Sequence, residues 1–198
     1  MKESKLKNKV DELETNEAFV KVMQWFFSYP LMPISLSDLA KEVEISKKTA
    51  NKIVLALIEE GFLIKEEIGK AWRIHCNQKH WYNSTNKISY NLLLVYNLLY
   101  RSRLIEKIYK ETGSPRAIIL FGSYRKGDDT EKSDIDLAVE VIGNNDMQII
   151  DLGTVEQLGY RKNVRINLHV FSRNKINLNL FSNISNGIVI EGFMEVRP

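Results

Sequence analysis

Cysteine is almost absent from this chain of 198 residues, in which Cys76 is the single example. One cysteine excludes an internal disulfide bond and any zinc site built from several thiolates. Long apolar runs are missing too, because no run approaches the roughly 18 residues that a membrane-spanning helix requires. The polar, basic start of the sequence also lacks the apolar segment of a secretory signal. We therefore expect a cytoplasmic protein with no membrane contact.

A strong net charge is missing as well. The chain has 28 Lys and Arg residues against 25 Asp and Glu residues, which gives a formal net charge of +3. A general positive field is thereby excluded, so any contact with nucleic acid depends on local patches. With 44% hydrophobic and 27% charged residues, the composition is typical of a globular chain that is long enough for two small cores.

The first 80 residues show three apolar helical patterns followed by a hairpin pattern. Helices are predicted over 16–28, 35–45 and 47–60, and serines precede the second and third. Gly61 is expected to end the third helix, and residues 62–75 indicate two strands that turn near Gly69. This succession resembles a winged helix-turn-helix domain, which we place at residues 1–80.

That resemblance implies DNA binding through the exposed start of the third helix. Lysine side chains there would meet phosphate groups, while Thr49 and Asn51 would reach base edges in a major groove. The predicted DNA-binding residues are Lys47, Lys48, Thr49, Asn51 and Lys52. A winged helix used for protein contact or dimerisation stays open as an alternative, because the first 80 residues are nearly balanced in charge.

A strongly apolar stretch separates the two halves of the sequence. Its pattern predicts a helix over 88–109. The stretch is too apolar for a solvated linker, so we expect the helical connector 81–112 to pack on the C-terminal domain or on a second copy of the chain. Together with the two-fold symmetry common among helix-turn-helix proteins, it predicts a homodimer.

The stretch after this connector predicts a strand that ends at a tight turn. Residues 118–121 form a short apolar run that stops at Gly122-Ser123. Gly122 lacks a side chain, so a bulky ligand can approach its backbone. Ser123 is expected to cap a following helical turn whose N–H groups favour phosphate. Beyond it, the basic side chains of Arg125 and Lys126 are expected to meet triphosphate oxygens.

Two aspartates follow on a second predicted strand. Asp134 and Asp136 alternate with apolar residues, which places both carboxylates on one face. At roughly 6–7 Å apart they repel each other unless a divalent cation lies between them. Oxygen atoms are the ligands that Mg²⁺ prefers, and phosphate oxygens complete its octahedron. The pair therefore predicts a metal site that also holds phosphate.

Gly122-Ser123 and Ser133-Asp134-Ile135-Asp136-Leu137 together resemble the signature of the DNA polymerase β-type nucleotidyltransferase superfamily, and their compact spacing is most similar to its minimal members. The resemblance implies an α+β domain at residues 113–198, with a mixed sheet flanked by helices. It implies that the catalytic Asp134 and Asp136 bind Mg²⁺ or Mn²⁺. It also implies a nucleoside triphosphate donor, whose binding residues are Gly122, Ser123, Arg125 and Ser133.

The family usually places a third carboxylate on a later strand. The best candidate strand is 164–171, in which apolar residues alternate with Arg165, Asn167 and His169. We assign Asn167 to the third catalytic position, although an amide carries no charge and accepts no proton at neutral pH. Glu140 and His169 are alternatives for the missing base.

The remaining elements are predicted from spacing alone. A helix is expected over 145–158, Ser172 is expected to cap a segment over 176–184, and residues 186–192 resemble the closing strand of the same family. These patterns predict a Mg²⁺-dependent enzyme that transfers a nucleotide to an unknown protein, RNA or small molecule, fused to a DNA-binding module. One alternative is a DNA-binding regulator whose nucleotidyltransferase fold has lost catalysis. Another is a protein-interaction adaptor.

Overall fold

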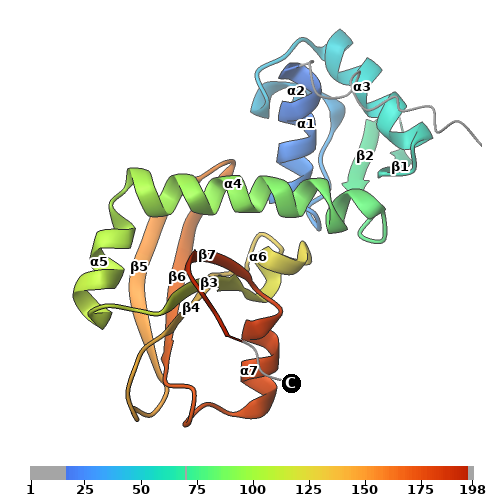
Figure 1. Ribbon diagram of the computed structural model, residues 1–198. Helices are drawn as coiled ribbons and strands as arrows, with labels where there is room; N and C mark the ends of the chain where they lie inside the picture. The colour runs from blue at the N-terminus through green and yellow to red at the C-terminus, as the bar shows by residue number, and fades with distance from the viewer. Residues whose placement is uncertain (1–16, 70, 196–198) are drawn as a thin grey trace, which may run out of the picture. The chain divides into compact units, whose positions relative to one another are not determined.

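The computed structural model describes residues 17–69 and 71–195. The chain divides into two compact units between Asn77 and Gln78, and each has its own sheet (Figure 1). The residues predicted as a separate connector, 81–112, lie wholly in the second unit. In the part of the chain that the structure describes, no helix is long and apolar enough to cross a membrane.

The first unit contains three helices and a two-stranded antiparallel hairpin. Its elements are α1 (Glu17–Ser28), α2 (Leu36–Glu42), α3 (Lys47–Glu59), β1 (Leu63–Ile68) and β2 (Ala71–Cys76). The predicted elements are therefore confirmed, except that Asn16, where the first helix was expected to begin, lies outside the described residues.

Serine caps and a buried apolar stripe explain the helices of the first unit. Ser35 accepts a hydrogen bond from the Asp38 amide at 3.1 Å, and Ser46 accepts one from the Thr49 amide at 3.0 Å. One face of each helix then enters the core, to which α3 contributes Ala50, Ile53, Val54 and Leu57. The opposite face of α3 is left to solvent.

The second unit is a mixed five-stranded sheet with helices on both faces. Before the sheet come η2 (Trp81–Ser84), α4 (Asn86–Arg101) and α5 (Leu104–Thr112). The other elements are β3 (Ala117–Phe121), α6 (Gly122–Lys126), β4 (Ile135–Glu140), β5 (Gln148–Leu158), β6 (Arg161–Phe171), α7 (Leu178–Ser185) and β7 (Ile188–Gly192). The strand order is β5-β6-β4-β3-β7, in which only β4 and β6 run parallel.

Helices cover both faces of this sheet (Figure 1), and each face has its own core cluster. On one face, Val95 and Leu99 of α4 and Leu104 and Ile108 of α5 pack against buried residues of β3, β4 and β6. On the other face, Ile184 of α7 packs with residues that include Ile119, Ala138 and Phe171. The apolar stretch predicted as a connector thus forms part of the core of the second unit.

That stretch forms two helices instead of the single helix predicted over 88–109. The chain turns at Arg103, which has a left-handed backbone with φ of 58°. A side chain disfavours this conformation, so helical spacing alone gave no sign of it. The turn lets Leu104 and Ile108 join the cluster already formed by Val95 and Leu99.

The helix predicted over 145–158 is wrong, because residues 148–158 form the edge strand β5. Its core residues are Ile150, Leu152, Val155 and Leu158. A β-bulge between Asp151 and Gly153 shifts the two-residue alternation by one position. The resulting spacing imitates a helical stripe, which explains the error.

The cap predicted at Ser172 is also wrong. Asn177 is the N-cap of α7, and its side-chain oxygen accepts a hydrogen bond from the Asn179 amide at 2.9 Å. Ser172 is buried, and its hydroxyl accepts a hydrogen bond from the Asn145 amide at 3.2 Å. The closing strand predicted over 186–192 is confirmed as β7.

Candidate active site

Three neighbouring strands place the predicted catalytic residues and their neighbours on the sheet face that α7 covers. Asp136 lies on β4, where it is paired with Phe121 of β3 on one side and with Asn167 of β6 on the other. Asp134 immediately precedes β4. Alternation along β4 puts Asp136 on the same face as Ala138, which belongs to the cluster with α7.

Asn167 joins the two aspartates through its side-chain amide. Its Nδ2 atom lies 3.3 Å from Asp134 Oδ2 and 3.4 Å from Asp136 Oδ1, and it donates toward both. One nitrogen can reach two carboxylates only if their oxygens converge on a common point. The structure therefore brings Asp134, Asp136 and Asn167 together, as their predicted roles require.

Gly122 lies directly against the Asp136 carboxylate. Its φ of +72° is left-handed, and a Cβ at this position would lie 2.6 Å from Asp136 Oδ2. No side chain could occupy that space without displacing the aspartate. The glycine turn and the carboxylate thus form one compact surface at the end of β3.

The other residues predicted to bind nucleotide lie around this turn and differ in burial and in hydrogen bonding. The cap predicted at Ser123 is wrong, because α6 begins at Gly122 and its N-cap, Phe121, makes no side-chain capping bond. Arg125 is half-buried on α6, one residue beyond the buried Tyr124. The Ser133 hydroxyl accepts a hydrogen bond from the Thr130 amide at 2.9 Å, so it also holds the loop before β4.

The two alternative bases lie in contrasting places. His169 Nε2 is 3.4 Å from Asp136 Oδ1, and the ring packs edge-on against Phe121, so this histidine belongs to the site. Glu140 lies on the same face at the other end of β4. Its buried carboxylate accepts two hydrogen bonds from Arg173, each 3.1 Å long. Glu140 therefore lies away from the two aspartates and does not fit the role of the missing base.

The donor atoms fit a Mg²⁺ ion bound jointly by protein and phosphate. Two convergent carboxylates are a usual protein contribution to such an ion, and substrate phosphates supply further oxygens. Among residues 17–69 and 71–195, no group of three or more His, Cys, Asp and Glu side chains is arranged to hold a metal. A Mg²⁺ ion held by Asp134 and Asp136 would need phosphate or water oxygens to complete its six ligands.

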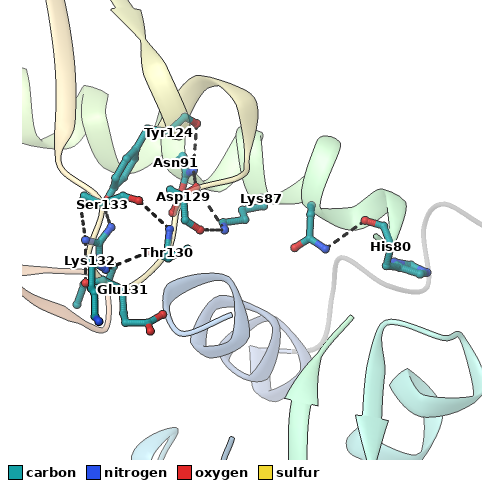
Figure 2. A network of polar contacts seen from close by, with 11 residues as sticks. His80, Lys87, Asn91, Tyr124, Asp129, Thr130, Glu131, Lys132 and Ser133 are labelled. Carbon is teal, nitrogen blue, oxygen red and sulfur yellow. Dashed lines mark hydrogen bonds and ion pairs between the residues drawn. The ribbon is translucent and has the colours of Figure 1, made fainter. Parts of the chain in front are cut away.

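A buried polar network that was not predicted from the sequence fixes the loop between α6 and β4 (Figure 2). Lys87 Nζ donates to the Asp129 carbonyl oxygen at 2.5 Å and lies 3.3 Å from Asp129 Oδ1. Asn91 Nδ2 donates to Asp129 Oδ1 at 2.7 Å and to the Tyr124 carbonyl at 3.0 Å. Burial raises the pKa of the Asp129 carboxyl, while Lys87 and Asn91 oppose that effect.

Arg161, the first residue of β6, holds the same loop from the side of the sheet. It donates to the Tyr124 hydroxyl and to the carbonyl oxygens of Ser133 and Glu131, the last at 3.2 Å. Burial raises the pKa of the Tyr124 hydroxyl far above its usual range, so the hydroxyl stays neutral. The loop that delivers Asp134 is thus held from two sides.

Helical spacing contained a signal for this network. Lys87, Asn91, Val95 and Leu99 are the buried residues of α4, and they are four residues apart. Positions four apart share one face of a helix. A lysine and an asparagine on an otherwise apolar stripe therefore indicate inward polar groups that need buried partners.

The predicted DNA-binding residues lie in the first turns of α3. Lys47, Lys48 and Lys52 are exposed, whereas Thr49 and Asn51 are half-buried. The Thr49 hydroxyl is also 2.8 Å from the Ser46 hydroxyl. These positions form a basic surface on the first unit, and their role in DNA binding stays a prediction.

Residues 103–191 match the protein family described as Polymerase beta, Nucleotidyltransferase. The matched stretch extends from the start of α5 into β7 and includes Gly122, Asp134, Asp136 and Asn167. This match agrees with the nucleotidyltransferase domain predicted in the C-terminal part. The match does not reach the first unit.

A second comparison concerns a shorter stretch. Over 40 residues the chain is 50% identical to a Methanocaldococcus jannaschii protein that is named as a protein adenylyltransferase. The aligned stretch is 20% of this chain and 40% of the archaeal protein. The chain thus spans about two fifths of the length of that relative.

Proposed function

We propose that the nucleotidyltransferase domain in residues 103–191 transfers a nucleoside monophosphate from a nucleoside triphosphate to an acceptor. One observation carries the proposal: the carboxylates of Asp134 and Asp136 converge beside the backbone of Gly122. Such a surface offers negative oxygens to a divalent cation and open backbone to a phosphate chain.

Each predicted residue has a part in this proposal. Asp134 and Asp136 would hold Mg²⁺ or Mn²⁺, which when bound would neutralise triphosphate oxygens and the charge of the leaving pyrophosphate. Gly122 and Ser123 would contact the phosphates through their backbone and hydroxyl groups. Arg125 would reach the phosphates from α6, and Ser133 would order the loop that brings Asp134 to the cation.

The proposed transfer forms one bond at the α-phosphorus and breaks another. An oxygen or nitrogen of the acceptor attacks the α-phosphorus and forms a new bond to it. The bond from that phosphorus to the oxygen shared with the β-phosphate breaks, and pyrophosphate leaves with the electron pair. The acceptor releases its proton to solvent water. Asn167 cannot take that proton, because an amide accepts none at neutral pH, so we expect slow turnover.

The acceptor that we propose to test first is a protein, with ATP as the donor, because the archaeal relative is named as a protein adenylyltransferase. RNA and small molecules stay alternatives. The exposed Lys47, Lys48 and Lys52 on α3 favour a DNA-binding role for a winged helix in the first unit. A DNA-binding regulator that retains nucleotide binding without transfer is therefore the second candidate.

Titration calorimetry with each nucleoside triphosphate and Mg²⁺ tests the donor site without an acceptor. We expect binding to the wild-type chain that requires Mg²⁺, and at least a hundredfold weaker binding to the double variant Asp134→Asn, Asp136→Asn. Thermal melting of the variant serves as the control for folding. If no triphosphate binds the wild type, the enzyme proposal fails.

A labelled α-phosphate separates the two candidate functions. Incorporation of label into a protein, RNA or small molecule supports the enzyme. Nucleotide binding without incorporation, together with salt-dependent binding to specific DNA, supports the regulator.

A further inference from the structure

The loop from Gly127 to Asp134 joins α6 to β4 and ends at one of the proposed metal ligands. Its start is confined by the chain around η2 and α4. A Cβ at Gly127, whose φ is +78°, would lie 1.9 Å from the Asn83 carbonyl oxygen and 3.1 Å from Ile88. The loop therefore passes against these segments without space for a side chain.

Two residues later, the loop is fastened by opposite charges that are both buried. The side chains of Lys87 and Asp129 are 0% and 2% exposed. The lysine contacts both the main-chain oxygen and the carboxylate of Asp129, and Asn91 binds the same carboxylate (Figure 2). Separating two desolvated charges leaves each without compensation, so Asp129 has little freedom to move.

The six residues from Asp129 to Asp134 are themselves held together by hydrogen bonds. The Thr130 amide donates to the Ser133 hydroxyl at 2.9 Å, and the Ser133 amide donates to the Thr130 carbonyl at 3.1 Å. Arg161 binds the carbonyl oxygens of Glu131 and Ser133 from the other side. A displacement at Asp129 would therefore reach Asp134 through a short, hydrogen-bonded turn.

We propose that Lys87 is a positioning residue for the metal site: it fixes Asp129, and through the braced turn it sets Asp134 against Asp136. This inference rests on the proposed function, because it assigns Lys87 a purpose in nucleotide binding beyond stability. The hydrophobic contacts of Val95 and Leu99 already hold α4 on the sheet. Lys87 is needed for the placement of the loop.

The test compares the wild type with Lys87→Met and with the double variant Lys87→Met, Asp129→Asn. The double variant removes both charges, so it leaves no uncompensated buried charge and keeps the test valid if the single variant fails to fold. Lys107→Met is the matched control. Lys107 Nζ donates to the Leu152 carbonyl oxygen at 3.0 Å, and this bond ties α5 to β5 and does not involve the loop.

Two measurements are made on each folded protein. Hydrogen–deuterium exchange reports the order of residues 127–134 in the absence of nucleotide. Titration with Mg²⁺ and ATP reports the assembled site. In the Lys87 variants we expect at least tenfold faster exchange in this loop, unchanged exchange in β4 and β6, and at least tenfold weaker Mg²⁺-dependent binding. Lys107→Met should change neither quantity.

The outcomes separate the two proposals. Loss of binding in the Lys87 variants, with β4 and β6 still protected, supports the positioning role. Wild-type affinity and wild-type loop exchange in either folded Lys87 variant overturn it, while the donor site stands. A wild-type chain that binds no triphosphate in the presence of Mg²⁺ overturns the proposed function and, with it, the positioning role.

Discussion

The two ends of strand β4 carry carboxylates on the same face, in opposite electrostatic surroundings. Glu140 is 1% exposed and is matched by Arg173 and by Arg116, whose Nη1 lies 3.5 Å from Glu140 Oε1. At the other end, the Asp136 side chain is 29% exposed. There, Asp136 contacts the side chains of Asn167 and His169, and Asp134 contacts that of Asn167.

The two ends of the strand therefore differ in where the charge that offsets their carboxylates comes from. Where the chain supplies its own cations, as at Glu140, the carboxylate is a structural group that joins β4 to neighbouring segments. Where two convergent carboxylates meet an amide and a histidine, their like charges repel, and the proposed divalent cation would offset that repulsion. The same residue chemistry thus joins segments of the fold at one end and supplies the proposed cation ligands at the other.

The largest change in stability is expected from Glu140→Gln, which tests whether the two ends of β4 have separate roles. The variant removes a buried charge from two arginines, and hydrogen bonds to charged groups are among the strongest in proteins, so we expect a loss of about 3 kcal/mol in unfolding free energy. Urea unfolding measures the loss. Nucleotide affinity in Mg²⁺, measured on the folded protein, should equal that of the wild type. A weaker affinity would show that the two ends are not independent.

An intermediate effect is expected from Asn167→Asp, which adds a third carboxylate beside Asp134 and Asp136. Like charges repel, so without metal the variant should be less stable than the wild type by about 1 kcal/mol. Added Mg²⁺ should then raise its melting temperature more than it raises that of the wild type. Pyrophosphate release from ATP should also become faster, because the new carboxylate can take the proton that the attacking group loses. Equal responses to Mg²⁺ in both proteins would contradict the proposed metal position.

The smallest effect on stability is expected at Glu191, a carboxylate that is hydrogen-bonded to neutral hydroxyl groups. It accepts hydrogen bonds from Tyr100 at 2.7 Å and Tyr109 at 2.8 Å. The bond to Glu191 raises the pKa of Tyr100 from 10.0 to about 12. Because the neutral hydroxyl is the donor, its stabilising effect is complete below pH 10 and is lost as the pH rises from 10 to about 12.

Tyr100→Phe measures that contribution. At pH 8 we expect the variant to be less stable by about 0.5 kcal/mol, a modest value for one exposed hydrogen bond. The difference between variant and wild type should shrink toward zero near pH 12 in urea unfolding. A difference that stays constant up to that pH would mean that the hydroxyl does not stabilise the fold through Glu191.

Local patterns predicted most elements and much of the candidate site. The strand before Gly122, the serine caps at Ser35 and Ser46 and the alternation of Asp134 with Asp136 depend on neighbouring residues, so they could be predicted from the sequence. Strand β5 could not, because its bulge at Asp151 disrupts the alternation that identifies a strand. The cap at Ser172 failed because a buried contact with Asn145 engages that hydroxyl.

The sequence by itself determined which groups this protein has for its chemistry: a glycine turn, two alternating carboxylates and an amide on a later strand. Only the tertiary structure decided which of them meet. The parallel pairing of β4 with β6 sets Asn167 beside Asp136, and the ion pair of Lys87 with Asp129 joins residues 42 positions apart. Short-range periodicity records how a segment packs, whereas contacts between distant segments depend on the register and burial of the whole fold.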